Sequence, residues 1–123
     1  MASLSGEVFA ANSLMSFDEY CRAVREANVN FVLTARECAP WYLQHIPVDK
    51  LVAQFGSDGG ASIGDGIVRH DAIVLIWPHH PYSCRIRLNG QRMSFEDIAI
   101  LPPGSHFIFS ADGPRTWISI SVP

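Results

Sequence analysis

The spacing of the apolar residues changes near residue 28. Over residues 16–28, in the segment SFDEYCRAVREAN, four of them recur at the spacing of one helical face: Phe17, Tyr20, Cys21 and Val24. Ser16 is followed three positions later by Glu19, the pattern of a capping box at a helix N-terminus. We therefore predict a helix over 16–28 whose apolar face packs against the rest of the molecule.

Beyond residue 28 the apolar residues form short, strand-like runs. The runs cover 30–38, 41–47, 50–56, 61–71, 72–78, 82–103, 106–110 and 116–123. Most are separated by Gly, Pro, Asn or Asp, and strands at this spacing are typical of a sandwich or barrel. The pattern predicts a single all-β domain with one N-terminal helix. Residues 1–15 would be an arm and residues 30–123 the barrel.

The dipeptide Asn89-Gly90 predicts a two-residue type I′ hairpin, because both central residues of that turn need positive φ. The facing pairs would be Leu88–Gln91, Ile86–Met93, Cys84–Phe95 and Tyr82–Asp97. This register places three basic residues on the face opposite the apolar one: Arg85, Arg87 and Arg92. We expect a solvated stripe there rather than an anion site.

The glycine-rich stretch GSDGGASIGDG, residues 56–66, resembles a phosphate-binding loop only in its glycines, since no Lys-Ser/Thr follows. We expect a hairpin connection with a bulge at Gly64 or Gly66. No Gly-x-Ser-x-Gly elbow occurs, and neither Asp65 nor Asp71 has a companion that suggests an acid/base pair. The sequence does not predict an enzyme.

Composition narrows the class of protein further. The 123 residues are 48% hydrophobic and 17% charged, which favours a folded domain, and the net charge of −3 argues against direct nucleic-acid binding. Three widely spaced cysteines give neither a disulfide framework nor a Cys-x-x-Cys zinc pair. The first residues lack the basic and apolar regions of a signal peptide, and the apolar run 72–77 is too short to span a membrane. We expect a cytoplasmic protein.

Five histidines are the potential metal ligands: His45, His70, His79, His80 and His106. A metal-binding barrel commonly draws two ligands from one strand as His-x-His, and that pair does not occur. His79 and His80 are adjacent, so in a strand they would point to opposite faces. We therefore expect no metal and no other cofactor.

The segment EDIAILPPGSHFIFS, residues 96–110, places two prolines and a glycine between two apolar runs. We expect a corner between strands at 102–104, where no ladder donor is needed. Phe107 and Phe109 would return to the core, and His106 would then point outward.

In order and spacing, these features resemble the N-terminal sensor domain of AraC-family transcriptional regulators, a cupin-like jelly roll. The resemblance runs from about Phe17 to Pro123 and rests on Asn89-Gly90, the ILPPG turn and the closing WISISVP. It implies a cupin-like double-stranded β-helix that binds a small effector and forms a homodimer. It also implies a C-terminal helix-turn-helix half that contacts DNA, and no such pattern occurs within these 123 residues.

The second cupin motif resembles Gly-x5-Pro-x-Gly-x2-His-x3-Asn, and Pro102 and Gly104 match it. Glu96, Phe107 and Ala111 stand where the motif has Gly, His and Asn. His106 is one residue short of the ligand position, and one step along a strand turns a side chain to the other face. This departure also argues against a metal.

Polar-tipped aromatic residues are the candidate contacts for an effector in such a barrel. The candidate ligand-binding residues are Trp41, His45, Trp77, Tyr82 and Phe95. The favoured hypothesis is an effector-sensing domain that does not contact a membrane and reaches DNA only through a separate half. Two alternatives remain: a small cupin enzyme, with or without metal, and a structural dimerisation module with a filled barrel.

Overall fold

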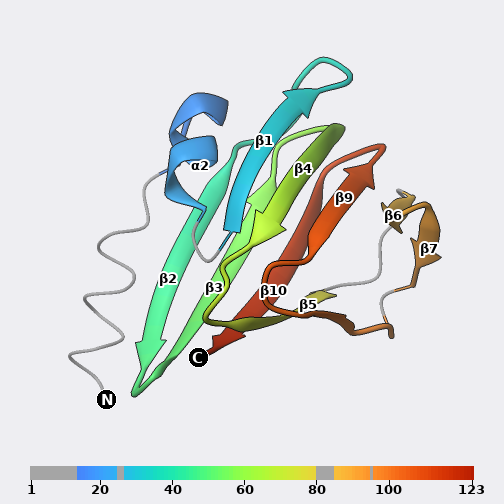
Figure 1. The fold of residues 1–123 in the computed structure, drawn as a ribbon. Helices are drawn as coiled ribbons and strands as arrows, with labels where there is room; N and C mark the ends of the chain where they lie inside the picture. Colours follow the sequence, from blue (N-terminus) through green and yellow to red (C-terminus); the bar gives the residue numbers. More distant parts are fainter. Residues whose placement is uncertain (1–13, 25–26, 80–84, 95) are drawn as a thin grey trace.

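The computed structural model describes residues 14–24, 27–79, 85–94 and 96–123. Within them the chain forms one helix followed by strands that make two layers (Figure 1). The elements are α2 (Phe17–Ala23), β1 (Ala27–Leu33), β2 (Tyr42–Val48), β3 (Leu51–Asp58), β4 (Ser62–Val68), β5 (Ile73–Pro78), β6 (Ile86–Leu88), β7 (Gln91–Met93), β8 (Ala99–Leu101), β9 (His106–Ala111) and β10 (Arg115–Val122).

The strands form two five-stranded antiparallel sheets, ordered β1-β4-β9-β6-β7 and β2-β3-β10-β5-β8. From β3 to β5 and again from β8 to β10, consecutive strands belong to alternate sheets, so the chain winds back and forth between the layers. This arrangement confirms the predicted all-β, double-sheet fold with one N-terminal helix. We refer to the two layers as the β4 sheet and the β10 sheet.

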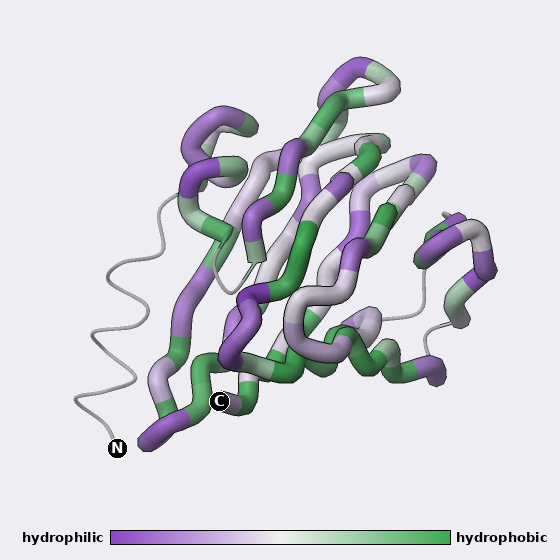
Figure 2. Tube along the Cα trace, in the orientation of Figure 1, coloured by the Kyte–Doolittle hydropathy of each residue, from purple (hydrophilic) through white to green (hydrophobic). Residues whose placement is uncertain are grey.

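Side-chain alternation decides which residues fill the space between the sheets. Buried and partly buried residues alternate strictly along β10. The buried ones, which face inward, are Arg115, Trp117, Ser119 and Ser121. In the β4 sheet, Phe107 and Phe109 face inward from β9, as the sequence predicted. In Figure 2 the strand segments carry most of the hydrophobic colouring, and the hydrophilic colouring gathers at turns and on the helix.

The helix is shorter than predicted. Ser16 caps α2, and the predicted capping box with Glu19 is present in both directions. The helix ends at Ala23, because Val24 is already extended, and β1 begins at Ala27. Residues 27 and 28 therefore pair with β4 instead of continuing the predicted helix to 28. Tertiary strand pairing outweighs local helical spacing at this point.

The Asn89-Gly90 hairpin has the predicted register. Asn89 and Gly90 have φ of 49° and 80°, and the pairs Leu88–Gln91 and Ile86–Met93 face each other. Its three arginines are exposed, as expected. The pairs that involve residues 82, 84 and 95 lie outside the described residues.

The prediction of a bulge in the glycine-rich stretch is wrong. β4 pairs without interruption with β1 and with β9, and Gly64 and Gly66 both face inward. A Cβ on Gly66 would lie 2.8 Å from the Asn28 carbonyl oxygen and 2.9 Å from Phe107 Cζ. The glycines therefore admit neighbouring side chains over the middle of the strand, and no extra residue enters the ladder.

The predicted corner at residues 102–104 is present. It joins β8 in one sheet to β9 in the other, with Gly104 at φ 72° and the Ser105 N–H donating to the Pro102 carbonyl. Phe107 and Phe109 follow in the core, and His106 points outward. The turn is thus a structural corner of the barrel.

A candidate binding site inside the barrel

A cavity of about 70 Å³ lies between the two sheets, beside α2. Its walls come from α2, from the residues just after it, and from both sheets. Five polar or mixed side chains are among them: Tyr20, Gln54, Arg115, Trp117 and Ser119. The rest of the lining is apolar, as in most small-molecule sites. The cavity is several times larger than the space one water needs.

The cavity exists partly because the inward positions near the centre of β4 are the glycines Gly64 and Gly66. Gly64 belongs to the lining, and the space above it is bounded by the rings of Phe31, Phe107 and Phe109 from the neighbouring strands. A Cβ on Gly64 would lie 2.9 Å from Phe31 Cε1. The size of the interior is therefore set by small residues in β4 and large ones beside it.

Arg115, one of the lining residues, belongs to a buried ion pair. Asp58, the last residue of β3, is directly opposite Arg115, the first residue of β10. Arg115 Nε lies 2.9 Å from Asp58 Oδ2, and their side chains are 7% and 2% exposed. Arg115 Cζ also lies 4.0 Å from the centre of the Phe109 ring. An isolated buried charge is costly, so the two groups depend on each other.

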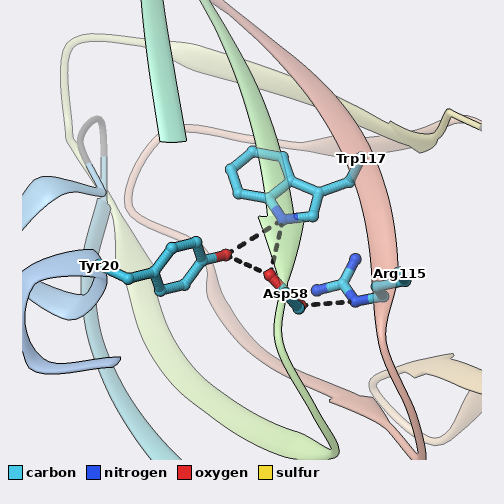
Figure 3. A network of polar contacts seen from close by, with 4 residues as sticks. All are labelled: Tyr20, Asp58, Arg115 and Trp117. Atoms are coloured by element: carbon cyan, nitrogen blue, oxygen red, sulfur yellow. Dashed lines mark hydrogen bonds and ion pairs between the residues drawn. The ribbon is translucent and has the colours of Figure 1, made fainter. Parts of the chain in front are cut away.

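Asp58 also connects the barrel to the helix (Figure 3). The Tyr20 hydroxyl, from α2, donates to Asp58 Oδ1 at 2.5 Å. Trp117 Nε1 donates to the same oxygen and to the Tyr20 hydroxyl, both at 3.1 Å. Burial, and then the negative charge of Asp58, raise the pKa of Tyr20 well above its usual value. Tyr20 therefore stays a neutral donor at any physiological pH.

Arg115 is held to Asp58 by charge rather than by a hydrogen bond from Nε. The contact of Nε with Asp58 lacks hydrogen-bond geometry, so Nε is a buried donor with an ionic partner but no hydrogen bond among the described residues. A guanidinium has five N–H groups, and Arg115 is one of the residues that line the cavity, so a bound molecule with an acceptor group could contact it. Arg115 is thus both a structural and a potential ligand-binding group.

A second polar row crosses the middle of the β10 sheet on its inner side. His45 Nε2 lies 3.1 Å from Gln54 Oε1, and Gln54 Nε2 donates to Ser119 Oγ at 3.2 Å. Gln54 and Ser119 are both 3% exposed and line the cavity. A serine hydroxyl that accepts a hydrogen bond keeps its own hydrogen for an acceptor. This row can orient a polar group of a bound molecule.

Of the five candidates from the sequence, the three that the structure describes are not lining residues of the cavity. Trp41 is buried beneath α2, against the rings of Phe17 and Tyr20, and is not part of the lining. His45 faces inward and reaches the cavity through Gln54. Trp77 pairs with Ile118 on the outer side of the sheet. Tyr82 and Phe95 lie outside the described residues.

The sequence analysis missed Asp58, Arg115 and Tyr20 as site residues. A signal was present: Arg115 is in phase with Trp117 in the alternating strand RTWISISV, and Asp58 is in phase with Gln54 and Gly56. A charged residue in phase with core residues indicates a buried charge that needs a partner. Which partner it meets depends on the strand order, which alternation alone does not give.

The residues at the cupin metal positions do not fit a metal. Phe107 and Ala111 occupy the His and Asn positions of the motif, and both are buried in an apolar cluster. His106 lies on the outer face, where its Nε2 is 2.5 Å from Asp65 Oδ1. Among the described residues no group of three or more His, Cys, Asp or Glu side chains is placed to hold a metal ion.

Comparisons with known proteins agree on the fold. No protein-family model matches the sequence, and no curated protein sequence matches it. An RmlC-like cupin from Shewanella frigidimarina superposes with a TM-score of 0.54 at 12% identity, over 68% of this chain and 76% of that one. KdgF from Halomonas sp. superposes with a TM-score of 0.53 at 12% identity, over 90% and 94%.

A putative ethanolamine utilization protein, EutQ, from Salmonella typhimurium gives a TM-score of 0.53 at 13% identity, over 68% and 70%. At such identities the likeness concerns the fold alone. In the part of the chain that the structure describes, no helix is long and apolar enough to cross a membrane. The chain has the cupin fold.

Proposed function

We propose that this domain is the effector-sensing part of a transcriptional regulator of the AraC type, and that it binds a small molecule in the barrel cavity. The observation that carries the proposal is the chain of contacts from the cavity to the helix. Arg115 lines the cavity and forms an ion pair with Asp58, and Asp58 accepts a hydrogen bond from the Tyr20 hydroxyl. A molecule that engages Arg115 therefore acts on the group that holds α2.

The lining indicates the chemical class of the effector. Most of the wall is apolar, and the polar groups are donors at two places, Arg115 at one end and Ser119 with Gln54 in the middle. A small aromatic or aliphatic molecule with one acceptor group, such as a carboxylate, matches this arrangement. The carboxylate would compete with Asp58 for the guanidinium.

The size of the cavity suggests that a ligand must displace part of its wall to enter. About 70 Å³ is roughly half of the approximately 150 Å³ that holds benzene in an engineered protein cavity. Val24, the C-cap residue of α2, lines the cavity. Ligand entry would displace Val24 and shift the population between two positions of the helix. The DNA-binding half would read that shift.

Binding of benzoate tests this function. We expect benzoate at 100 times its dissociation constant to add about 2.7 kcal/mol to the free energy of unfolding, and therefore to raise the melting temperature. Arg115→Lys keeps the charge but loses the planar fork, and should weaken benzoate at least about tenfold while leaving toluene binding unchanged. No stabilisation by either compound would contradict the proposal. Two helix-turn-helix segments in the downstream reading frame would support the regulatory role.

The small size of the cavity favours a second candidate function. In it, the domain is a structural dimerisation module whose barrel is filled by its own side chains and binds no ligand. A cavity of about 70 Å³ lies well below the roughly 300–1,000 Å³ of most ligand pockets. The two functions differ in one result: the structural module would gain no stability from any small apolar acid, and its α2 would not move on addition of one.

A further inference from the structure

The outer side of the β10 sheet is an uncharged apolar surface that spans all five strands. We call it the β10 face and define it as the outward residues of β2, β3, β10, β5 and β8. Its central row is Ile46, Ala53, Ile120, Leu75 and Ile100. The row beside it is Gln44, Phe55, Ile118 and Trp77. No outward position in these five strands is Asp, Glu, Lys or Arg.

Apolar residues of this face are open to solvent in the single chain. Ile100 is 65% exposed, Val48 52% and Ile73 41%. The other residues of the two central rows are only partly buried. The exception is Gln44, which is buried and accepts a hydrogen bond from the Tyr42 hydroxyl. Figure 2 shows hydrophobic colouring along most of β5. A soluble monomer rarely keeps a contiguous apolar surface of this extent.

The outer side of the β4 sheet is different, although it belongs to the same fold. Its corresponding rows include Asp65 and His106, which pair with each other, and the exposed pair Arg87–Arg92. Exposed apolar residues lie on this side too, namely Val32, Ile63, Ile67 and Ile108, but here they are interspersed with charged residues. The contrast shows that an uncharged outer face is not a requirement of this barrel, so the β10 face needs its own explanation.

We propose that two copies of this chain dimerise through their β10 faces. A two-fold dimer brings the same patch together from both sides, so any charge on it would meet a like charge near the axis. The β10 face has none to repel. Two twisted sheets also pack well face to face, about 10 Å apart, with their strand directions about 30° apart.

The area of the face suits a stable dimer. The five strands have 7, 8, 8, 6 and 3 residues, and at about 4.8 Å between strands and about 3.4 Å per residue they give a flat area of about 520 Å² per copy. The relief of the side chains adds accessible area to this value, and a standard interface buries roughly 800 Å² per partner. The aromatic rings of Phe55 and Trp77 would supply its anchors.

The mass of the protein in solution, measured by light scattering, tests this interface. We expect twice the 13.6 kDa of one chain at micromolar concentration. Ile120→Lys, at the centre of the face, and Ile100→Lys, on its edge strand, should each weaken the dimer at least about 100-fold and yield monomers. Ile108→Lys, on the outer side of β9, is the matched control and should remain a dimer. Circular dichroism checks that all three variants are folded.

Three outcomes would overturn the proposal. One is a wild-type chain that stays monomeric at about 100 µM, a concentration at which a standard interface is formed. Another is a dimer that survives both lysine substitutions in folded protein. The third is a monomer that dimerises only after residues 1–13 are deleted, which would mean that this segment covers the face. The interface does not rest on ligand binding: benzoate binding by monomeric Ile120→Lys protein would leave the sensor proposal intact.

Discussion

Tyr20 is the residue on which the helix, the ion pair and the cavity depend together. It is 1% exposed, donates to Asp58 and accepts from Trp117. Tyr20→Phe removes the hydroxyl and leaves Asp58 without one of its donors. We expect a loss of about 1–3 kcal/mol in the free energy of unfolding at neutral pH, measured by urea denaturation.

The raised pKa of Tyr20 also makes stability depend on pH. An unfolded tyrosine ionises near pH 10.0, whereas the folded protein keeps Tyr20 protonated beyond that point. The contribution is complete below pH 10.0 and is lost as the pH rises above it, because the unfolded state releases its proton first. Between about pH 8 and 11, Tyr20→Phe should lose less stability than the wild type. Equal slopes for the two proteins would show that Tyr20 ionises freely.

At this scale the sequence predicts positions better than partners. Alternation correctly placed His106 outward and Phe107 and Phe109 inward. It could not pair Asp58 with Arg115, because they are 57 positions apart in the numbering (115 − 58) and meet only through the order of strands in a sheet. Nor could it bring Tyr20 to them, since the docking of α2 depends on the whole end of the barrel.

Helix α2 is the element most dependent on local sequence, because it is only one or two turns long and its capping box supplies much of its order. Ser16→Ala should lower the free energy of unfolding by about 1 kcal/mol, through the lost hydrogen bond to the Glu19 N–H. Ser16→Asp keeps an acceptor at the cap and is the control. If Ser16→Ala and Ser16→Asp are equally destabilised in thermal melts, the box does not hold the helix.

Strand β4 contains the two glycines at which the sequence predicted a bulge and the structure shows uninterrupted pairing. Gly66→Ala would push a methyl group into the Asn28 carbonyl and the Phe107 ring, at 2.8 and 2.9 Å. We expect a loss of about 1–3 kcal/mol from this overpacking. Asp65→Ala, on the outward side of the same strand, should change stability by no more than about 0.5 kcal/mol. A Gly66→Ala protein as stable as the wild type would mean that β4 can shift away from β1.

At the scale of the whole molecule, alternation and turn chemistry predicted an all-β sandwich or barrel, the hairpin at Asn89-Gly90 and the corner at 102–104, and the family resemblance implied the double-sheet arrangement. The two outer faces could not be told apart from the sequence, because runs such as AIVLIW are apolar at every position. Only the register between strands shows that one outer face is free of charge and that the other is not.

The central claim is that the cavity binds a small acid and passes the event to α2. The most direct measurement is the exchange of the Tyr20 and Cys21 backbone amides with deuterium, with and without benzoate, in wild-type protein and in Val74→Phe, which fills the cavity. The account predicts that benzoate changes the exchange of α2 in the wild type and leaves it unchanged in Val74→Phe. Unchanged exchange in the wild type at saturating benzoate, or the same change in both proteins, would contradict it.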